Sequence, residues 1–435
     1  MRKRSNPHVV LGLGLIAALA VPSALAAENL YGGGATLPAQ PYVGSNYLST
    51  NPDARLSTNA GNTAGSGYGT ATLGSGSVFL TYSNNSTNKV SYCQASSLIG
   101  KNTLAGSTTA NQACQDFSVS SLGLSGGAAA PDFIGTDAPY STADYNVFLG
   151  GGNAASRVGI VQVPTLAGAI ALPQSTPTVS FNLSAAQVCQ IYSGLVTDWN
   201  SVFVSGTTGP IKIVYQRDGS GTSFAFTSYL ARTCNGTSNV PSGFTFTPNQ
   251  IFNSALPGGV NNVYGSRAVG ASGDNGVVTS VRFTNTNALG YASIGEVLLQ
   301  AADYVTINGF DPAQFGRNSS GQATPISLGA SALLSGRVLD GSTVNSVPGS
   351  AAATVKNCVR LVNPNSVITN TYPIVAITYL AGFTSGNGSA AHVQAVKDLF
   401  NIFYNTSTRP ALPQGFAYLG GVTASAQNTV NTCVQ

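Results

Sequence analysis

The stretch VGIVQVPTLAGAIAL, Val158–Leu172, constrains the fold of this chain more than any other. It is almost continuously apolar and contains several β-branched residues, which is typical of a strand buried on both faces. Helical and extended patterns alternate after it: SAAQVCQIYSG has apolar residues at helical spacing, IKIVYQ is extended, and SFAFTSYL is again helical. The same alternation continues through GDNGVVTSVRF and NALGYASI, and it predicts a parallel α/β architecture.

The length of the chain, 435 residues, is enough for two ordinary domains with separate cores. We therefore predict two α/β lobes that are joined by two crossings of the chain. Lobe 1 is expected to contain residues 27–165 and 297–435, and lobe 2 residues 166–296. An elaboration rich in Gly, Ser, Thr and Ala is expected at about 67–131, with a strand over Ser77–Ser83.

Residues 1–26 have the layout of a secretory signal peptide. Basic residues precede the apolar run Val9–Val21, and Ala24-Leu25-Ala26 offers small residues for cleavage. A retained membrane anchor is the competing interpretation, but Pro22 and the Ala-x-Ala pattern end the run. We expect a soluble mature protein that begins near Ala27 and is periplasmic or secreted to the extracellular space.

Six cysteines follow the leader, and an even number in an oxidising compartment predicts disulfides. Three bridges allow fifteen connectivities, and the spacing does not choose among them. Bridges between chain neighbours are the simplest arrangement. The expected pairs are Cys93 with Cys114, Cys189 with Cys234, and Cys358 with Cys433.

Charge is scarce, at 7% of residues against about 25% in an average domain. Eighteen basic residues, three of them in the leader, face fourteen acidic ones, so nothing attracts nucleic acid or an anionic membrane generally. His392 is the only histidine after the leader, and we expect it to face solvent or cap a helix. Ser-His-Asp catalysis and multi-histidine metal sites are therefore poorly supported, and we expect no cofactor or metal.

Several short loops have the composition of an oxyanion site. Backbone N–H groups at helix N-termini and small hydroxyls can hold an anion with little protein charge, and glycine lets the backbone approach it closely. DGSGTSFAFTSYL opens a helix in this way, although a capped helix after a tight turn explains it as well. GGGATLP, TAGSGYG and FIGTDAPYS add Thr36 with the N–H of Leu37, Ser66 and Asp137; a turn or a helix cap also explains Asp137.

Six segments, taken in order, resemble motifs of one family: GGGATLPAQPY, FIGTDAPYS, VCQIYSGLVTDWN, RDGSGTSFAFTSYL, GDNGVVTSV and NALGYASIGE. The family comprises the phosphate-binding proteins that serve bacterial phosphate ABC transporters, with the related secreted DING phosphate-binders. The resemblance spans most of Leu30 to Glu296. It implies a two-lobed type II periplasmic binding protein fold with two hinge crossings and dehydrated inorganic phosphate in the cleft. The implied phosphate ligands are Thr36, Leu37, Ser66 and Asp137 from the first lobe, and Ser220, Gly221 and Thr222 from the second.

A carboxylate such as Asp137 that faces an anion is costly unless the ligand donates a proton to it. Asp137 would therefore accept a hydrogen bond from hydrogen phosphate and repel fully ionised sulfate. An unpaired buried acceptor costs about 1 to 3 kcal/mol, and charge repulsion adds to this. Selectivity would then depend on one hydrogen bond.

The sequence departs from the family at the position of its arginine, which is Gln216 here. Arg217 follows and is a candidate ligand, but neighbouring side chains on a strand face opposite ways, so an ion pair with Asp218 or a surface position is the alternative. Trp199 is interpreted as a core residue and Asp274 as a turn or helix-cap residue.

The resulting hypothesis is a non-enzymatic, monomeric solute-binding protein for inorganic phosphate. A phosphate ABC permease in the inner membrane is its candidate partner. The long stretch between Ser66 and Asp137 could lie beside the cleft or obstruct the surface that docks on such a permease. Binding of another tetrahedral oxyanion or of a phosphate ester is the first alternative. A secreted phosphatase with Ser220 or Thr222 as nucleophile is the second, and a structural surface protein the third.

Overall fold

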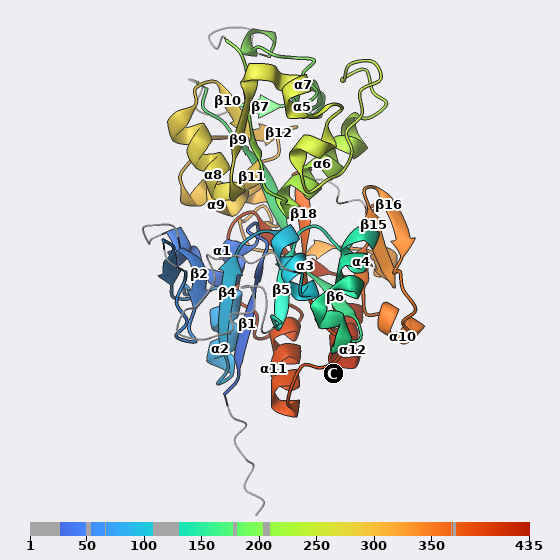
Figure 1. The fold of residues 1–435 in the computed structure, drawn as a ribbon. Helices are drawn as coiled ribbons and strands as arrows, with labels where there is room; N and C mark the ends of the chain where they lie inside the picture. The colour runs from blue at the N-terminus through green and yellow to red at the C-terminus, as the bar shows by residue number, and fades with distance from the viewer. Residues whose placement is uncertain are drawn as a thin grey trace, which may run out of the picture.

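The computed structural model describes residues 27–48, 54–65, 67–107, 130–176, 181–202, 209–366, 368 and 371–435. Two α/β lobes lie end to end in it, with the strands β6 and β18 where they meet (Figure 1). The predicted signal peptide lies outside the described residues. Within the described part of the chain, no helix has the length and apolar character that crossing a membrane requires.

The first lobe is built on a mixed sheet whose long strand β6 lies between β19 and β18. Strand β1 pairs in parallel with both β4 and β5, and β18 pairs antiparallel with β5 and β6. The strands in sheet order are β13 (Ile326–Ser327), β19 (Phe416–Gly420), β6 (Ile160–Pro173), β18 (Val375–Phe383), β5 (Phe133–Thr136), β1 (Asn29–Gly34), β4 (Lys89–Gln94), β2 (Ala54–Thr58) and β3 (Gly69–Ala71).

Serine side chains begin several helices of this lobe by accepting hydrogen bonds from backbone N–H groups of the first turn. Ser77 is one of them, and its Oγ accepts from the N–H of Leu80. The strand expected over Ser77–Ser83 is therefore wrong, because the cap starts a helix there. The helices are α1 (Ala39–Val43), α2 (Val78–Asn85), α3 (Ser97–Ala105), α4 (Thr142–Gly150), α10 (Ala353–Lys356), α11 (Ala390–Asn401) and α12 (Thr423–Cys433).

The stretch interpreted as an elaboration, 67–131, contributes β3, α2, β4 and α3 to the lobe itself. Two of its large side chains, Phe79 and Tyr92, are fully buried and pack against Tyr42. Residues 108–129 lie outside the described part of the chain. Two antiparallel ribbons complete the lobe: β14 (Leu333–Ser335) with β17 (Arg360–Val362), and β15 (Arg337–Asp340) with β16 (Thr343–Ser346).

The second lobe contains a parallel sheet in the order β10 (Ala288–Gly290), β8 (Lys212–Gln216) and β9 (Ala268–Ala271). This confirms the predicted parallel α/β alternation. Its helices are α5 (Ala185–Tyr192), α6 (Gly221–Cys234), α7 (Gly259–Tyr264), α8 (Gly273–Thr279), which continues as a π-helical turn over Ser280–Thr284, and α9 (Ile294–Leu299). Trp199 is fully buried in this lobe, as expected for a core residue.

Strand β6 connects the lobes, and all of its residues are buried, which confirms the strand predicted from Val158–Leu172. Its first part pairs with β18 and β19, and its last part with β11 (Ala292–Ser293) and β12 (Tyr304–Ile307) of the second lobe. Strand β12 also pairs with β7 (Asn182–Leu183). The chain thus enters the second lobe along β6 and leaves it after β12. The pairing of β12 with β6 and β7 places the end of this lobe beyond the predicted residue 296, and the other lobe boundaries stay a prediction.

Two of the expected disulfides are present. Cys189 pairs with Cys234 and joins α5 to the end of α6, and Cys358 pairs with Cys433 at the end of α12. The third expected pair stays a prediction, because Cys114 lies outside the described residues.

Candidate functional site

The first turn of α6 faces the first lobe. Ser220 precedes the helix, and its Oγ accepts hydrogen bonds from the N–H groups of Thr222 at 3.1 Å and Ser223 at 3.5 Å. A Cβ atom at Gly221 would lie 2.4 Å from Ser97 Oγ and 2.6 Å from Asp137 Cβ, both in the first lobe. Glycine is therefore required at this position, because any side chain would separate the lobes.

Asp137 follows β5 and is 3% exposed. Its Oδ1 accepts a hydrogen bond of 2.9 Å from Thr378 on β18, and its backbone N–H donates to Ser97. The following helix, α4, is capped by Ser141 and Asp144 instead. Asp137 is therefore a buried carboxyl group at the interlobe contact and has no capping role there.

Asp274, in the first turn of α8, joins residues of both lobes. Its Oδ2 accepts hydrogen bonds from Thr36 Oγ1 of the first lobe at 3.0 Å and from Thr222 Oγ1 of the second lobe at 3.2 Å. Its Oδ1 accepts from Gln216 Nε2 at 2.6 Å and from the N–H of Ser293 at 3.2 Å. We call Thr36, Asp137, Gln216, Thr222 and Asp274 the interlobe cluster.

Both carboxyl groups of the interlobe cluster are held in a poorly solvated place. Burial raises the pKa of Asp137 to about 8, and the charge of Asp274 adds to this rise while the Thr378 hydrogen bond opposes it. Burial also raises the pKa of Asp274 to about 7, with Glu296 and Asp218 adding to it. Ion pairs in the described residues involve only Lys101 and His392 as cations, so neither carboxyl group has a cationic partner.

The structure brings together six of the eight residues proposed from the sequence. Thr36, Asp137, Ser220, Gly221 and Thr222 lie at the lobe contact, and the carbonyl of Leu37 accepts a hydrogen bond from Ser293. Ser66 lies outside the described residues.

Arg217 is not brought to the interlobe cluster. Its side chain is exposed and lies along Gly270 of β9, whereas its neighbour Gln216 is fully buried and turned to Asp274. This follows from the opposite directions of successive side chains on a strand. Asp218 accepts a hydrogen bond from the N–H of Gly273, so an ion pair with Arg217 is not its contact in the structure.

The interpretation of Asp274 as a turn or helix-cap residue was wrong: it lies in the first turn of α8, but its side chain does not cap the helix. A topological signal was present in the sequence. Gln216 ends β8 and Asp274 comes shortly after β9, and these two strands are parallel neighbours. Residues that follow the carboxyl ends of adjacent parallel strands meet at one edge of a sheet, which is where α/β proteins place ligands.

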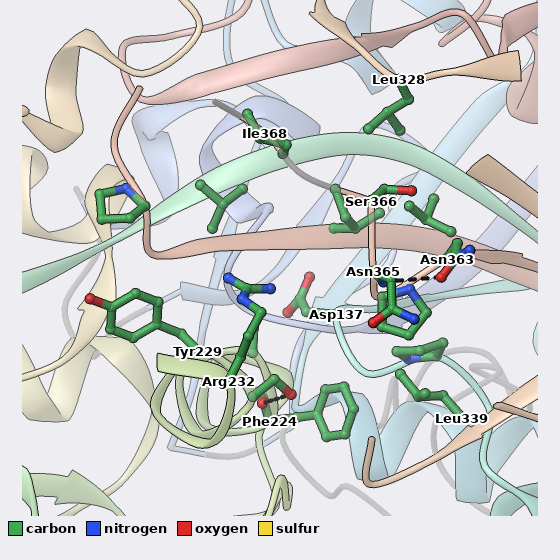
Figure 2. A pocket seen from close by; sticks show the side chains of 18 of the residues that line it. Asp137, Phe224, Tyr229, Arg232, Leu328, Leu339, Asn363, Asn365, Ser366 and Ile368 are labelled. Atoms are coloured by element: carbon green, nitrogen blue, oxygen red, sulfur yellow. Dashed lines mark hydrogen bonds between the residues drawn. The ribbon is translucent and has the colours of Figure 1, made fainter. Parts of the chain in front are cut away.

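A cavity of about 450 Å³ adjoins the interlobe cluster and shares Asp137 with it (Figure 2). One face of α6 forms a wall, because Phe224, Ser228 and Arg232 follow each other at four-residue spacing. Strand β18 and the loop before it form the opposite wall, mostly with apolar side chains. Asp137 and Arg232 are the charged residues in this lining.

His392 is neither solvent-facing nor the cap of its helix. Its Nδ1 lies 2.9 Å from Glu28 Oε2 and its Nε2 lies 2.8 Å from Asp132 Oδ1. Hydrogen bonds to Asp132 and Glu28 raise the pKa of this imidazole to about 9 against the effect of partial burial. The cap of α11 is Ser389, and α11 lies at the end of the first lobe away from the second lobe (Figure 1).

The two α/β lobes and the polar cluster between them define a two-lobed binding protein of the periplasmic type. The model of the family described as PBP superfamily domain matches residues 53–395. The chain therefore belongs to the PBP superfamily.

Two curated relatives match part of the chain. Alkaline phosphatase L of Pseudomonas aeruginosa (strain UCBPP-PA14) is 30% identical over 264 residues, which are 57% of this chain and 60% of that protein. A phosphate-binding protein from an unknown prokaryotic organism is 26% identical over 261 residues, 57% of this chain and 65% of that protein. The chain thus spans less than two thirds of the length of both.

A solved structure of a phosphate-binding protein from Stenotrophomonas maltophilia matches almost the whole chain. The two share 19% identity and a TM-score of 0.59, with 94% of this chain and 98% of that one covered. At this level of sequence identity, the comparison shows the fold and does not show the function. It confirms the predicted two-lobed type II periplasmic-binding architecture.

Proposed function

We propose that this chain is an exported solute-binding protein that captures inorganic phosphate between its lobes. One observation carries the proposal: the hydroxyl groups of Thr36 and Thr222, which belong to opposite lobes, converge on one carboxylate oxygen, Oδ2 of Asp274, and Gly221 next to Thr222 lies against Asp137. Two donors that meet only when the lobes are together are what capture by closure requires. The name of the phosphate-binding relative supports the same ligand.

The proposed ligand set combines hydroxyls, backbone N–H groups and one acceptor. Thr36 and Thr222 donate through their hydroxyls, and the first turn of α6 adds N–H groups and its partial positive charge. Asp137 accepts a hydrogen bond from a proton of the phosphate. The remaining proposed ligands are Leu37 through its N–H, Ser66, Ser220 and Gly221.

Calorimetric titration of the purified mature protein with phosphate, and separately with sulfate, tests the proposal. Above about pH 8, where Asp137 is ionised, we expect one site that binds phosphate and binds sulfate more weakly by at least tenfold, because fully ionised sulfate has no proton for Asp137. A protein that gives no heat with millimolar phosphate would refute the proposal. Equal affinity for the two anions would refute the role of Asp137 while leaving oxyanion binding in place.

We further propose that the protein binds phosphate without turnover, although one relative is named alkaline phosphatase L. Ser220 Oγ accepts hydrogen bonds from backbone N–H groups at the start of α6, and Thr222 donates its proton to a carboxyl group. The histidine of the described chain is held by Glu28 and Asp132. Hydrolysis of 4-nitrophenyl phosphate that is lost on Ser220→Ala would overturn this proposal.

Delivery of phosphate to an ABC permease is the cellular role that we propose, with the protein acting as a monomer in the periplasm or outside the cell. The leader sequence and the periplasmic-binding fold support export and capture. Co-purification of the protein with a phosphate permease complex in detergent tests the partnership. Phosphate uptake that is unchanged in cells lacking this chain would argue against it.

The cavity beside Asp137 favours a second candidate ligand, a phosphate ester. At about 450 Å³ it lies within the size range of small-molecule sites, about 300 to 1,000 Å³. Its wall carries the aromatic residues Phe224, Tyr229 and Tyr379, and Arg232 is the basic residue in its lining. A phosphate group at the interlobe cluster could thus direct an organic substituent into this space.

A further inference from the structure

We propose that Asp274 is a second carboxyl group that senses the protonation of the ligand, so that phosphate is captured together with one proton from solvent. The inference rests on the proposed function, namely phosphate binding at the interlobe cluster. The inference goes beyond the proposed function by assigning the protonation state in which the phosphate complex forms. It also assigns a specificity-determining role to a residue that the sequence resemblance does not place in the site.

The first argument is the balance of charge. Asp137 and Asp274 are both nearly fully buried, and the position expected for an arginine holds the neutral Gln216. Carboxyl groups that share a site cannot both stay ionised without a large cost, and a phosphate dianion between them increases this cost. One added proton removes a full negative charge from the complex.

The groups packed around Asp274 do not provide a positive charge instead. Asp218, after β8, bonds to the N–H of Gly273, and Glu296, on α9, bonds to Asn275 and Tyr47. Tyr291 is a neutral phenol, because burial raises its pKa strongly; its oxygen accepts a hydrogen bond from the N–H of Gln216, and its hydroxyl shares a second one with Ser223. The surroundings that the structure describes are thus acidic or neutral on every packed side.

The second argument is the count of hydrogen-bond protons. A threonine hydroxyl has one proton, and the protons of Thr36 and Thr222 both go to Oδ2 of Asp274. If these hydroxyls turn to the phosphate, Oδ2 loses both of its donors while it is still buried. A buried carboxylate oxygen without donors is strongly disfavoured, so the loss of these bonds drives Asp274 to take up a proton.

The third argument is an unused acceptor beside this carboxyl group. The Oε1 atom of Gln216 is buried and has no hydrogen-bond partner among the described residues, while Nε2 of the same amide bonds to Asp274. A buried acceptor of this kind needs a donor. Protonated Asp274 or a hydroxyl group of the phosphate supplies one, after rotation of the amide. The arginine that the family has at this position would offer donors only.

The pKa of Asp274 supports the geometry. Burial raises it to about 7, so protonation near neutral pH costs little free energy even before phosphate arrives. The pKa of Asp137 is raised further, to about 8, so the variants have to separate the two carboxyl groups. Phosphate binding raises this pKa further, since it adds negative charge and withdraws the two threonine donors. Phosphate binding is therefore stronger at low pH, and it weakens as pH rises above the pKa of Asp274 in the free protein.

Calorimetry tests the proton directly. The mature protein is titrated with phosphate at pH 8.5, where free phosphate is a dianion, in buffers of different ionisation enthalpy. The variation of the heat with the buffer measures the number of protons that binding takes up. We expect between about half a proton and one proton, and correspondingly an association constant that falls about threefold to tenfold per pH unit between pH 8 and pH 9.

Four variants decide which group takes up the proton: Asp274→Asn, Asp137→Asn, Gln216→Arg and a control. Asp274→Asn should bring proton uptake close to zero and remove the pH slope, and Gln216→Arg should do the same by supplying the missing positive charge. Asp303→Asn is the matched control, because Asp303 is an exposed carboxyl group of the second lobe outside the interlobe cluster. It should leave proton uptake unchanged. If Asp274→Asn does not fold, the test compares proton uptake in Gln216→Arg with proton uptake in the wild-type protein.

The outcomes separate the inference from the proposed function. Phosphate that binds wild-type protein at pH 8.5 without proton uptake overturns the inference and leaves phosphate capture standing. Uptake that persists in Asp274→Asn and is lost in Asp137→Asn overturns it as well, because the proton then goes to Asp137. A protein that binds no phosphate at any pH overturns both.

Discussion

Thr36 in the first lobe donates a hydrogen bond to Asp274 in the second lobe, across a distance of 3.0 Å. Thr222 donates to the same carboxylate oxygen from the start of α6. The two lobes are thus joined by a polar contact that uses the very hydroxyl groups proposed as phosphate ligands. Removal of one of these hydroxyls should therefore weaken both the contact between the lobes and the binding of phosphate.

Thr36→Val keeps the shape of the side chain and removes the donor. A hydrogen bond to a charged group contributes about 1.5 to 3 kcal/mol, so we expect phosphate affinity to fall by at least about tenfold. Thr81→Val is the matched control, because that hydroxyl bonds to the carbonyl of Ser77, the residue that caps α2, away from the interlobe cluster. Calorimetric titration compares the variants; a Thr36→Val protein with wild-type affinity would show that the hydroxyl does not contact phosphate.

Asp137→Asn should reduce the preference for phosphate over sulfate. The change replaces an acceptor that repels sulfate by an amide that can donate to it, and an acceptor of this kind is worth about 1 to 3 kcal/mol. We expect sulfate to bind more tightly and phosphate less tightly, so that the ratio of the two affinities falls about tenfold or more. An unchanged ratio in competition titrations would contradict the assigned role.

Gly221→Ala should hold the lobes apart. Its new Cβ would lie 2.6 Å from Asp137 Cβ and 2.4 Å from Ser97 Oγ, closer than atoms can approach. We expect weaker phosphate binding and a larger radius of gyration with phosphate by small-angle scattering. Gly150→Ala is the control, since no atom lies within 4 Å of the place that its new Cβ would occupy. Equal radii for the two variants would argue against closure at Gly221.

Ser228→Phe tests the cavity beside Asp137. A phenyl group at this position on α6 fills space that an organic substituent would need, whereas Ser228→Ala leaves the space open. If phosphate esters are ligands, Ser228→Phe should lose binding of 4-nitrophenyl phosphate and keep binding of phosphate, and Ser228→Ala should keep both. If Ser228→Phe still binds both phosphate and 4-nitrophenyl phosphate, the cavity is not where an ester substituent lies.

His392 should stabilise the fold in a pH-dependent way. Its pKa is raised to about 9 by Asp132 and Glu28, so its contribution is fully present below about pH 6.5 and is lost as pH rises through about 9. Solvent screening limits the effect, and we expect His392→Gln to lower the free energy of unfolding by about 1 kcal/mol at pH 7. Denaturant titrations at pH 7 and pH 10 measure it; a difference that is equal at both would contradict the ion pairs.

The sequence predicted the elements with strong periodicity and missed the contacts that only tertiary packing creates. Apolar patterns predicted the strand over Val158–Leu172 and the helix after Ser220, and both are confirmed. Ser77–Ser83 was misread because its apolar residues fit a short strand, while the deciding interaction is one serine cap.

The candidate site shows the same division. Thr36, Asp137 and Thr222 lie in glycine-rich loops whose motifs can be read directly. Asp274 could not be placed in this way, because GDNG is also an ordinary turn, and its role depends on the alignment of β8 with β9. Gln216 was recognised as a departure from the family, but its contact with Asp274 required the fold.

A crystal structure of the mature protein grown with phosphate tests the central claim most directly. We predict a tetrahedral anion between the lobes, within hydrogen-bonding distance of Thr36 Oγ1, Thr222 Oγ1 and an Oδ atom of Asp137. An anion bound elsewhere, or one that contacts residues of a single lobe only, would contradict capture by closure of the two lobes.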